Sequence, residues 1–222
     1  MGKMIELTAA DGHKLSAYRA DPPAKPRGAV VVIQEIFGVN SHIQSVADGF
    51  AADGYLAIAP ALFDRVQRGV DLGYSPEDIA KGREIRGKVT NDMAMKDVAA
   101  AVKEASGAGK VGIVGYCWGG FVAWLASAEV PGLACAVPYY GGGMPDHAHV
   151  QPKVPVMGHF GSKDAHIPVE GVKKLAAAHP SHQFFIYEAD HGFNCDQRGS
   201  YNAAAAKEAR SRTLEFLRKN LG

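Results

Sequence analysis

The segment at residues 110–120, KVGIVGYCWGG, decides how this chain folds. Its first part is a short run of β-branched and small apolar residues, which is typical of a strand covered on both faces. Its second part places glycines two positions before and two positions after Cys117, and the apolar stretch FVAWLASAEV follows. A buried strand, a tight turn and a helix in this order predict one unit of a parallel sheet.

The same alternation continues along the chain. The turn pair Asp11-Gly12 separates segments 4–8 and 14–19, which alternate polar and apolar residues and predict a hairpin at the antiparallel edge of the sheet. Apolar residues at spacings of three and four predict helices between the later strands. We therefore expect an α/β fold, a doubly wound and mostly parallel sheet with helices on both faces. The expected strands are 28–34, 55–60, 110–116, 133–140, 153–160 and 182–188, and the expected helices are 42–53, 92–105, 118–129, 168–178 and 202–219, with short helices near the site within 62–91.

Composition narrows the class of protein. Among 222 residues, 47% are hydrophobic, and no internal domain boundary is visible, so one domain spanning 1–222 is expected. The 24 basic residues nearly balance 23 acidic ones, which argues against nucleic acid or an anionic membrane as a partner. The three cysteines are widely spaced and fit neither a disulfide framework nor a zinc motif. With no signal peptide or membrane span in the sequence, we expect a cytoplasmic protein that acts on a small molecule.

Cys117 is the candidate nucleophile. It occupies the position that serine holds in a G-x-S-x-G elbow, where a strand turns sharply into a helix and presents one side chain above the sheet. Unpaired amides at the helix N-terminus would favour its thiolate. Most lone cysteines are inert and buried. That description suits Cys135, which lies inside an apolar strand, whereas the flanking glycines favour a functional Cys117.

An elbow of this kind predicts an acid and then a histidine downstream, each in a loop after a strand. Asp164 follows the strand 153–160 and His191 follows the strand 182–188. His191 would transfer the proton and Asp164 would orient its ring. Asp190 ranks second as the acid because it adjoins His191. The other histidines considered fit the role of base less well: His147, His149, His159 and His166.

With these residues in place, the chain resembles the dienelactone hydrolase family. The resemblance rests on GYCWGG at 115–120, on QEIFG at 34–38, on the turn DHGF at 190–193 and on the C-terminal helix, and it covers nearly the whole chain. It implies an α/β-hydrolase fold and an enzyme that opens small esters or lactones. It also implies Cys117 as nucleophile, His191 as base and Asp164 as the third member of a triad.

The resemblance implies further roles around the nucleophile. Glu35 would lie beside the resting thiol and keep it protonated, since a neighbouring carboxylate raises a thiol pKa. The backbone N–H groups of Ile36 and Trp118 would form the oxyanion hole. Cys195 stands where characterised family members carry a substrate-binding arginine. Arg198, three residues further on, could replace that arginine only through a different loop path.

The remaining predicted contacts concern the substrate pocket. Arg83 is the candidate for the other carboxylate-binding arginine of the family, with Lys81 and Arg86 as alternatives. Aromatic side chains could wall a small apolar pocket, and Cys195 could also line it. The aromatic candidates are Phe37, Tyr74, Trp118, Tyr139, Tyr140 and Phe193.

Three hypotheses for the function follow. The first is a hydrolase without cofactor or metal that opens a dienelactone-like ester or lactone through a thioester on Cys117. The second is a general carboxylesterase or thioesterase of the same fold for substrates without a carboxylate. The third is a non-catalytic protein that binds a small molecule. A monomer or a small homo-oligomer is expected in each case.

Overall fold

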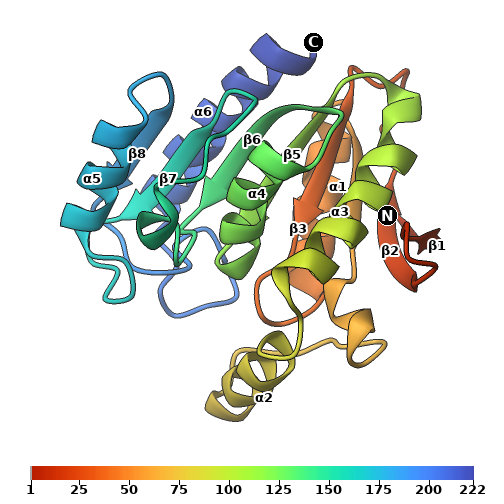
Figure 1. Ribbon diagram of the computed structural model, residues 1–222, viewed down its shortest axis with the longest axis horizontal. Coiled ribbons are helices and arrows are strands. Elements are labelled where there is room, and N and C mark those ends of the chain that lie inside the picture. The colour runs from red at the N-terminus through yellow and green to blue at the C-terminus, as the bar shows by residue number, and fades with distance from the viewer. Residues whose placement is uncertain (1) are drawn as a thin grey trace.

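The computed structural model describes residues 2–222, which form one mixed sheet with the strand order β1-β2-β4-β3-β5-β6-β7-β8 (Figure 1). The hairpin β1-β2 pairs antiparallel with β4, and the strands from β3 to β8 are parallel, as predicted. The strands are β1 Lys3–Thr8, β2 Lys14–Ala20, β3 Ala29–Ile33, β4 Leu56–Pro60, β5 Val111–Tyr116, β6 Leu133–Tyr139, β7 Met157–Gly161 and β8 Gln183–Tyr187. The α-helices are α1 Ser41–Ala52, α2 Pro76–Arg86, α3 Asn91–Ala105, α4 Trp118–Glu129, α5 Val169–Ala178 and α6 Ala203–Leu221, and short 3-10 helices are η1 Leu62–Arg65, η2 Ser106–Ala108 and η3 Pro145–His147.

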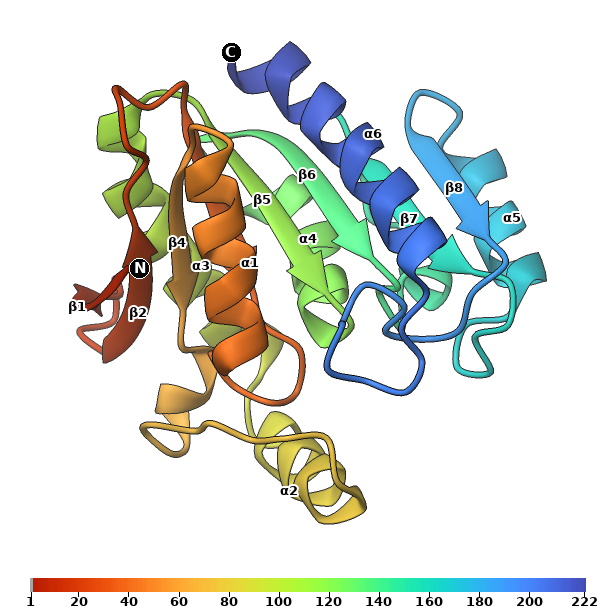
Figure 2. The ribbon, with the colours of Figure 1, turned by 180° about the vertical axis from the view of Figure 1, so that it is seen from behind.

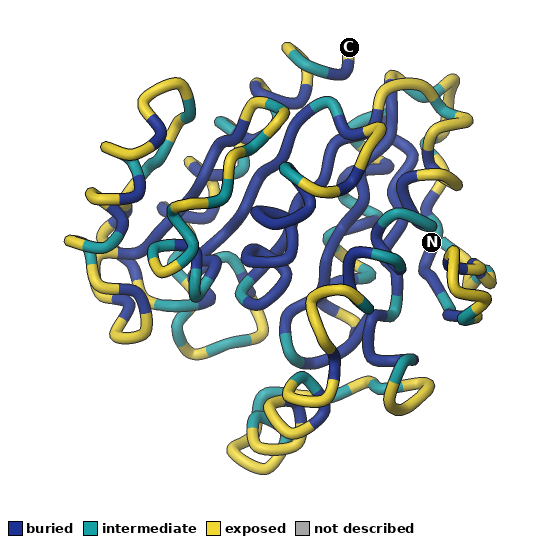
Figure 3. The backbone as a smooth tube through the Cα atoms, viewed as in Figure 1, coloured by how far each residue is buried: buried dark blue, intermediate teal, exposed yellow. Residues whose placement is uncertain are grey.

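Helices cover both faces of the sheet. α3, α4 and α5 lie on the face toward the viewer in Figure 1, and α1 and α6 lie on the opposite face, seen in Figure 2. Every residue of β3 and β5 is buried, as expected for strands between two helical layers. Figure 3 shows these central strands in dark blue, with exposed backbone concentrated in the outer helices and loops.

The topology places the candidate residues at one edge of the sheet. β3 and β5 are neighbours, but the chain continues from β3 to β4 on one side and from β5 to β6 on the other. Ligands bind outside the carboxyl ends of parallel strands at such a switch point. Glu35 follows β3, Cys117 follows β5, and the loops after β7 and β8 carry Asp164 and His191. These four residues therefore emerge along the same edge.

α2 stands apart from the two helical layers, below this edge in Figure 1. Its N-terminus is closed by a capping box between Ser75 and Asp78. Gly82 packs directly on the loop after β3, since a Cβ at this position would lie 2.1 Å from the carbonyl oxygen of Ile36. The short helices expected within 62–91 are present, and α2 lies over the edge that carries the candidate site.

Cys117, Cys135 and Cys195 are all free thiols. Cys135 is buried in β6, and burial raises its pKa to about 12. It therefore has the character of an inert core residue, as predicted. In the described part of the chain, no helix has both the length and the apolar surface that a membrane span requires.

Candidate active site

The turn between β5 and α4 holds Cys117 in a backbone conformation with φ 55° and ψ −117°. Such strained conformations persist only where the surroundings enforce them. A Cβ on Gly115 would lie 1.9 Å from the carbonyl oxygen of Gly119, and a Cβ on Gly119 would lie 2.4 Å from that of Gln34. Any side chain at either position would collide with a backbone carbonyl oxygen, so both positions require glycine. The turn leaves the Cys117 side chain partly exposed at the edge of the sheet.

His191 joins Cys117 to Asp164. Its Nε2 lies 3.0 Å from Sγ of Cys117, and its Nδ1 lies 2.7 Å from Oδ2 of Asp164. The Asp164 side chain is fully buried, and its other oxygen accepts the backbone N–H of His166 at 2.8 Å. The structure thus brings together the thiol, the imidazole and the carboxylate that the sequence predicted, from loops after three different strands.

The electrostatic surroundings of His191 favour its protonated form. Burial by itself lowers the pKa of the imidazole, but the charge of the Cys117 thiolate and the hydrogen bonds to Asp164 and Cys117 outweigh it and raise the pKa to about 10. An imidazolium beside a thiolate is the charge distribution expected of an activated cysteine.

The alternative acid and bases occupy other positions. Asp190 accepts the backbone N–H of His191 at 2.6 Å and so bonds to its main chain. His159 is buried between Tyr187 and Thr213, and burial lowers its pKa to about 3. His159 is therefore a neutral core residue and does not fit the role of the catalytic base.

Two residues with unpaired backbone amides line the same cavity as the thiol. Ile36 and Trp118 line the cavity that contains Cys117, and within residues 2–222 neither backbone N–H has a hydrogen-bond acceptor. Trp118 is the first residue of α4, where an amide has no partner inside the helix. Unpaired amides beside a nucleophile can stabilise a developing oxyanion.

Glu35 is paired differently from the expectation drawn from the resemblance. Its side chain is buried, and its Oε1 accepts a hydrogen bond from Nη1 of Arg198 at 3.0 Å. The thiol of Cys117 is instead hydrogen-bonded to His191. No hydrogen bond links Glu35 to Cys117 in the described chain. The guanidinium of Arg198 lies close enough to compete with the thiol for the carboxylate, which explains the difference.

A cavity of about 460 Å³ opens over Cys117. Arg83, Phe37 and Arg198, three of the predicted substrate contacts, line it, and Arg198 also lies over the rings of Phe37 and Tyr74. Of the two alternatives to Arg83, Arg86 also lines the cavity, and its guanidinium lies 5.8 Å from the centre of the Trp118 ring. Lys81 is paired with Glu84 instead. The walls combine apolar side chains with several cationic groups: Ile36, Phe37, Ile79, Arg83, Arg86, Cys117, Trp118, Phe121, Gly142, Gly143, His147, His166, His191 and Arg198.

Four of the aromatic candidates, Tyr74, Tyr139, Tyr140 and Phe193, do not line this cavity. Tyr140 and Phe193 are fully buried, and their ring centroids lie 5.2 Å apart. The ring of Tyr140 also lies 5.2 Å from that of His191, while the ring of Phe193 packs against that of Tyr187. Both residues belong to the core outside the cavity lining, so their prediction as pocket residues is corrected. Cys195 is likewise buried and outside the lining.

Several lining residues were not predicted. Ile79 lies on the same face of α2 as the predicted Arg83 and its alternative Arg86, a pattern that helical spacing could have indicated once α2 was known to cover the site. His147 and His166 were set aside as bases, yet both line the cavity, and the His166 ring lies 5.4 Å from that of His191. No local sequence signal identifies them, since their position depends on loop paths.

Comparison with known proteins identifies the family of this chain. Residues 15–221 match the model of the dienelactone hydrolase family. A "carboxymethylenebutenolidase" of Pseudomonas putida is 34% identical, with 96% of this chain and 94% of the relative covered. A "putative carboxymethylenebutenolidase" of Synechocystis is also 34% identical, with coverage of 94% and 93%.

Solved structures share the fold. A crystal structure of a "putative dienelactone hydrolase" from Klebsiella pneumoniae is 33% identical, with a TM-score of 0.83 and coverage of 96% of this chain and 98% of that one. A dienelactone hydrolase-like promiscuous phosphotriesterase from metagenomic libraries reaches a TM-score of 0.80 at 19% identity, which indicates a common fold alone. The chain belongs to the dienelactone hydrolase family and is a hydrolase with the α/β-hydrolase fold.

Proposed function

We propose that this hydrolase opens a small, anionic ester or lactone through a Cys-His-Asp triad and a thioester intermediate. The observation that carries the proposal is the continuous chain of contacts from Cys117 Sγ to His191 and on to Asp164, with distances of 3.0 Å and 2.7 Å. The names of the relatives, carboxymethylenebutenolidases, agree with a lactone as substrate.

In the first half of the reaction, the Cys117 thiolate attacks the carbonyl carbon and forms a C–S bond. The carbonyl oxygen gains negative charge and would accept the unpaired N–H groups of Ile36 and Trp118. As the oxyanion collapses, the bond to the ring or ester oxygen breaks, and the leaving oxygen takes the proton from His191. The product of this half is a thioester.

In the second half, neutral His191 removes a proton from water, which attacks the thioester carbonyl. The C–S bond then breaks, the acid product leaves, and the thiolate beside imidazolium is restored. Asp164 keeps Nδ1 of the ring protonated, so that Nε2 faces the reacting atoms throughout.

The charge of the cavity favours an anionic substrate. Arg83, Arg86 and Arg198 line its wall, and the guanidinium of Arg198 is balanced by Glu35. A carboxylate on the substrate would compete with Glu35 for the guanidinium of Arg198. Arg198 thereby takes the part that the resemblance assigned to an arginine at the position of Cys195, which favours the first hypothesis over a general esterase.

Replacing Cys117 with alanine tests the reaction. We expect turnover of an activated aryl ester and of a carboxylated lactone to fall at least about a thousandfold, since loss of a triad nucleophile removes most of the catalysis. Cys135→Ala, which alters a thiol in β6, is the matched control and should keep its activity. Wild-type turnover by the Cys117 variant would disprove the proposal. A strong preference for uncharged esters would favour the general esterase instead.

A further inference from the structure

A second group of metal-ligating side chains lies in the interior, outside the triad. Glu35, His42 and Cys195 each present a ligand atom, and the carboxylate oxygen, ring nitrogen and thiol sulfur all lie within 4.8 Å of one another. All three residues are buried, with exposed fractions of 1%, 3% and 0%. They come from the loop after β3, from α1 and from the loop after β8.

Two atoms of this cluster are unpaired. Oε2 of Glu35 and Nε2 of His42 are buried and have no hydrogen-bond partner among the described residues. Leaving a buried polar atom without a partner costs about 1–3 kcal/mol, and more when the group is charged. Two such atoms in one cluster with a thiol therefore indicate a missing electrophilic partner.

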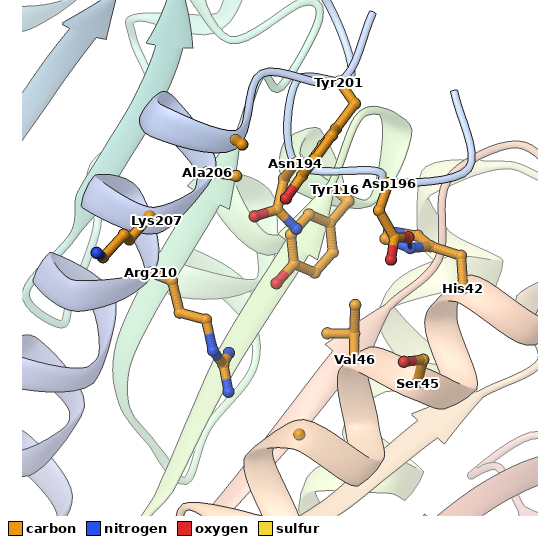
Figure 4. A pocket seen from close by; sticks show the side chains of 12 residues that line it. His42, Ser45, Val46, Tyr116, Asn194, Asp196, Tyr201, Ala206, Lys207 and Arg210 are labelled. Atoms are coloured by element: carbon orange, nitrogen blue, oxygen red, sulfur yellow. Dashed lines mark ion pairs between the residues drawn. The ribbon is translucent and has the colours of Figure 1, made fainter. Parts of the chain in front are cut away.

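The surroundings of His42 match those of a metal-binding histidine. Its Nδ1 lies 3.4 Å from Oδ1 of Asp196, and Figure 4 shows the two side chains facing each other at one side of a pocket. A metal-bound imidazole commonly has its other ring nitrogen against a carboxylate, which fixes the ring and increases its basicity. That arrangement leaves Nε2 of His42 available for a metal ion.

The pocket in Figure 4 reaches one residue of the cluster, His42. It has a volume of about 330 Å³, and His42 and Asp196 line it together with Tyr116, Asn194 and Arg210. Asp196 is 67% exposed, so an ion arriving from solvent would meet a carboxylate first and the His42 ring next.

We propose that Glu35, His42 and Cys195 bind a transition metal ion of the zinc class. A thiolate, an imidazole and a carboxylate are the ligands that Zn²⁺ and Co²⁺ accept, and three protein ligands leave a fourth position for water. The inference does not rest on the triad, because neither Cys117 nor His191 is a ligand, and it shares only Glu35 with the Arg198 pair at the cavity wall. Sequence analysis predicted no metal site because the three ligands are far apart in the chain.

Binding would displace a proton from Cys195. Coordination deprotonates a thiol and releases the proton to solvent. The bound ion would join the loops after β3 and β8 to α1.

The test is Co²⁺ binding, with reduced thiols, to the Cys117→Ser protein, in which the competing thiol of the triad is absent. We expect a thiolate-to-cobalt charge-transfer band in the near ultraviolet and displacement of Co²⁺ by Zn²⁺. Adding Cys195→Ser should abolish the band, whereas adding Cys135→Ala should leave it unchanged. Persistence of the band after loss of Cys195, or its absence from the Cys117→Ser protein, would overturn the proposal.

A second measurement uses ligands other than sulfur. Zn²⁺ should raise the melting temperature of the Cys117→Ser protein, because an ion that binds only the folded state stabilises it. Adding His42→Gln should remove this increase, and adding Asp196→Asn should weaken Zn²⁺ affinity by roughly 10- to 100-fold, the effect of losing the partner of a ligand. Equal Zn²⁺ affinity in all three proteins would contradict the site even if each variant folds normally.

Discussion

Arg198 donates to Glu35 at 3.0 Å across 163 positions of sequence, and this ion pair connects the wall of the cavity to the buried end of β3. The carboxylate is almost fully buried, while the guanidinium is 20% exposed and faces the cavity. The pair therefore holds a cation where a substrate can reach it. The Glu35 carboxylate, the other member of the pair, remains in the core.

The Arg198–Glu35 pair predicts linked effects on binding and stability. Arg198→Met should raise the KM for a carboxylated lactone by roughly 10- to 100-fold, the value of a hydrogen bond between charged groups. The same change leaves the Glu35 carboxylate buried and unpaired, which costs about 3–5 kcal/mol of unfolding free energy. Steady-state kinetics and urea unfolding measure the two effects.

The double variant Glu35→Gln with Arg198→Met is the control for stability. It removes both charges, so much of the lost unfolding free energy should return while the KM for the anionic substrate stays high. Equal stability of the single and double variants would argue against a buried charge as the cause.

The orientation of His191 predicts that the two neighbouring aspartates differ in importance. Asp164→Asn should lower kcat by up to about 10,000-fold, since an amide at this position favours the wrong tautomer of the ring. Asp190→Asn should have a small effect, because Asp190 bonds only to the backbone N–H of His191. Comparison of kcat for the two variants checks the assignment, and a larger loss for Asp190→Asn would reverse it.

The pKa of His191 predicts a specific pH dependence. The folded-state value is about 10, against an ordinary value of 6.5, so protonation of His191 favours the folded state. This contribution to stability is complete below about pH 6.5 and is lost as the pH rises through about 10. Cys117→Ser removes the thiolate and should lower the pKa.

Histidine proton resonances followed by NMR titration give this value directly in both proteins. We expect His191 of the wild type to titrate near pH 10 and that of Cys117→Ser clearly below it. Identical titration of the two proteins near pH 6.5 would show that no thiolate–imidazolium pair forms.

The contact between Gly82 and Ile36 predicts that the position of α2 affects kcat, because it sets the position of the Ile36 amide. A methyl group at Gly82 would lie 2.1 Å from the Ile36 carbonyl oxygen and must move either α2 or the loop that carries the Ile36 amide. Gly82→Ala should lower kcat by about 100-fold, since misplacement by about 1 Å can cost that much, and should destabilise the fold by about 1–3 kcal/mol.

Gly87→Ala is the matched control, because a Cβ there would only approach carbonyl oxygens at 3.4 Å and 3.5 Å and the residue has φ −61°. It should keep normal kcat and stability. Equal kcat for both variants would exclude a role for α2 in positioning the oxyanion amide.

Sequence analysis predicted the elements of the fold well because their signals are local. The buried strands, the hairpin turn at Asp11-Gly12 and the helices α1 and α3–α6 lie within a few residues of the expected bounds. The order of Cys117, Asp164 and His191 along the chain also placed them after strands whose carboxyl ends share one edge. Contacts of side chains across the cavity had no comparable signal.

What the amino-acid sequence determined by itself is the turn at Cys117, since Gly115 is required by the carbonyl oxygen of Gly119 within the same strand-turn-helix unit, whereas Gly119 is required by the neighbouring strand β3 and the loop after it. Only the tertiary structure decided that Arg198 pairs with Glu35, that Tyr140 and Phe193 are buried outside the cavity, and that Glu35, His42 and Cys195 converge. The physical reason is distance along the chain. The conformation of a turn depends on adjacent residues, whereas these pairings depend on the path of the loop after β8, which packing of the whole sheet sets.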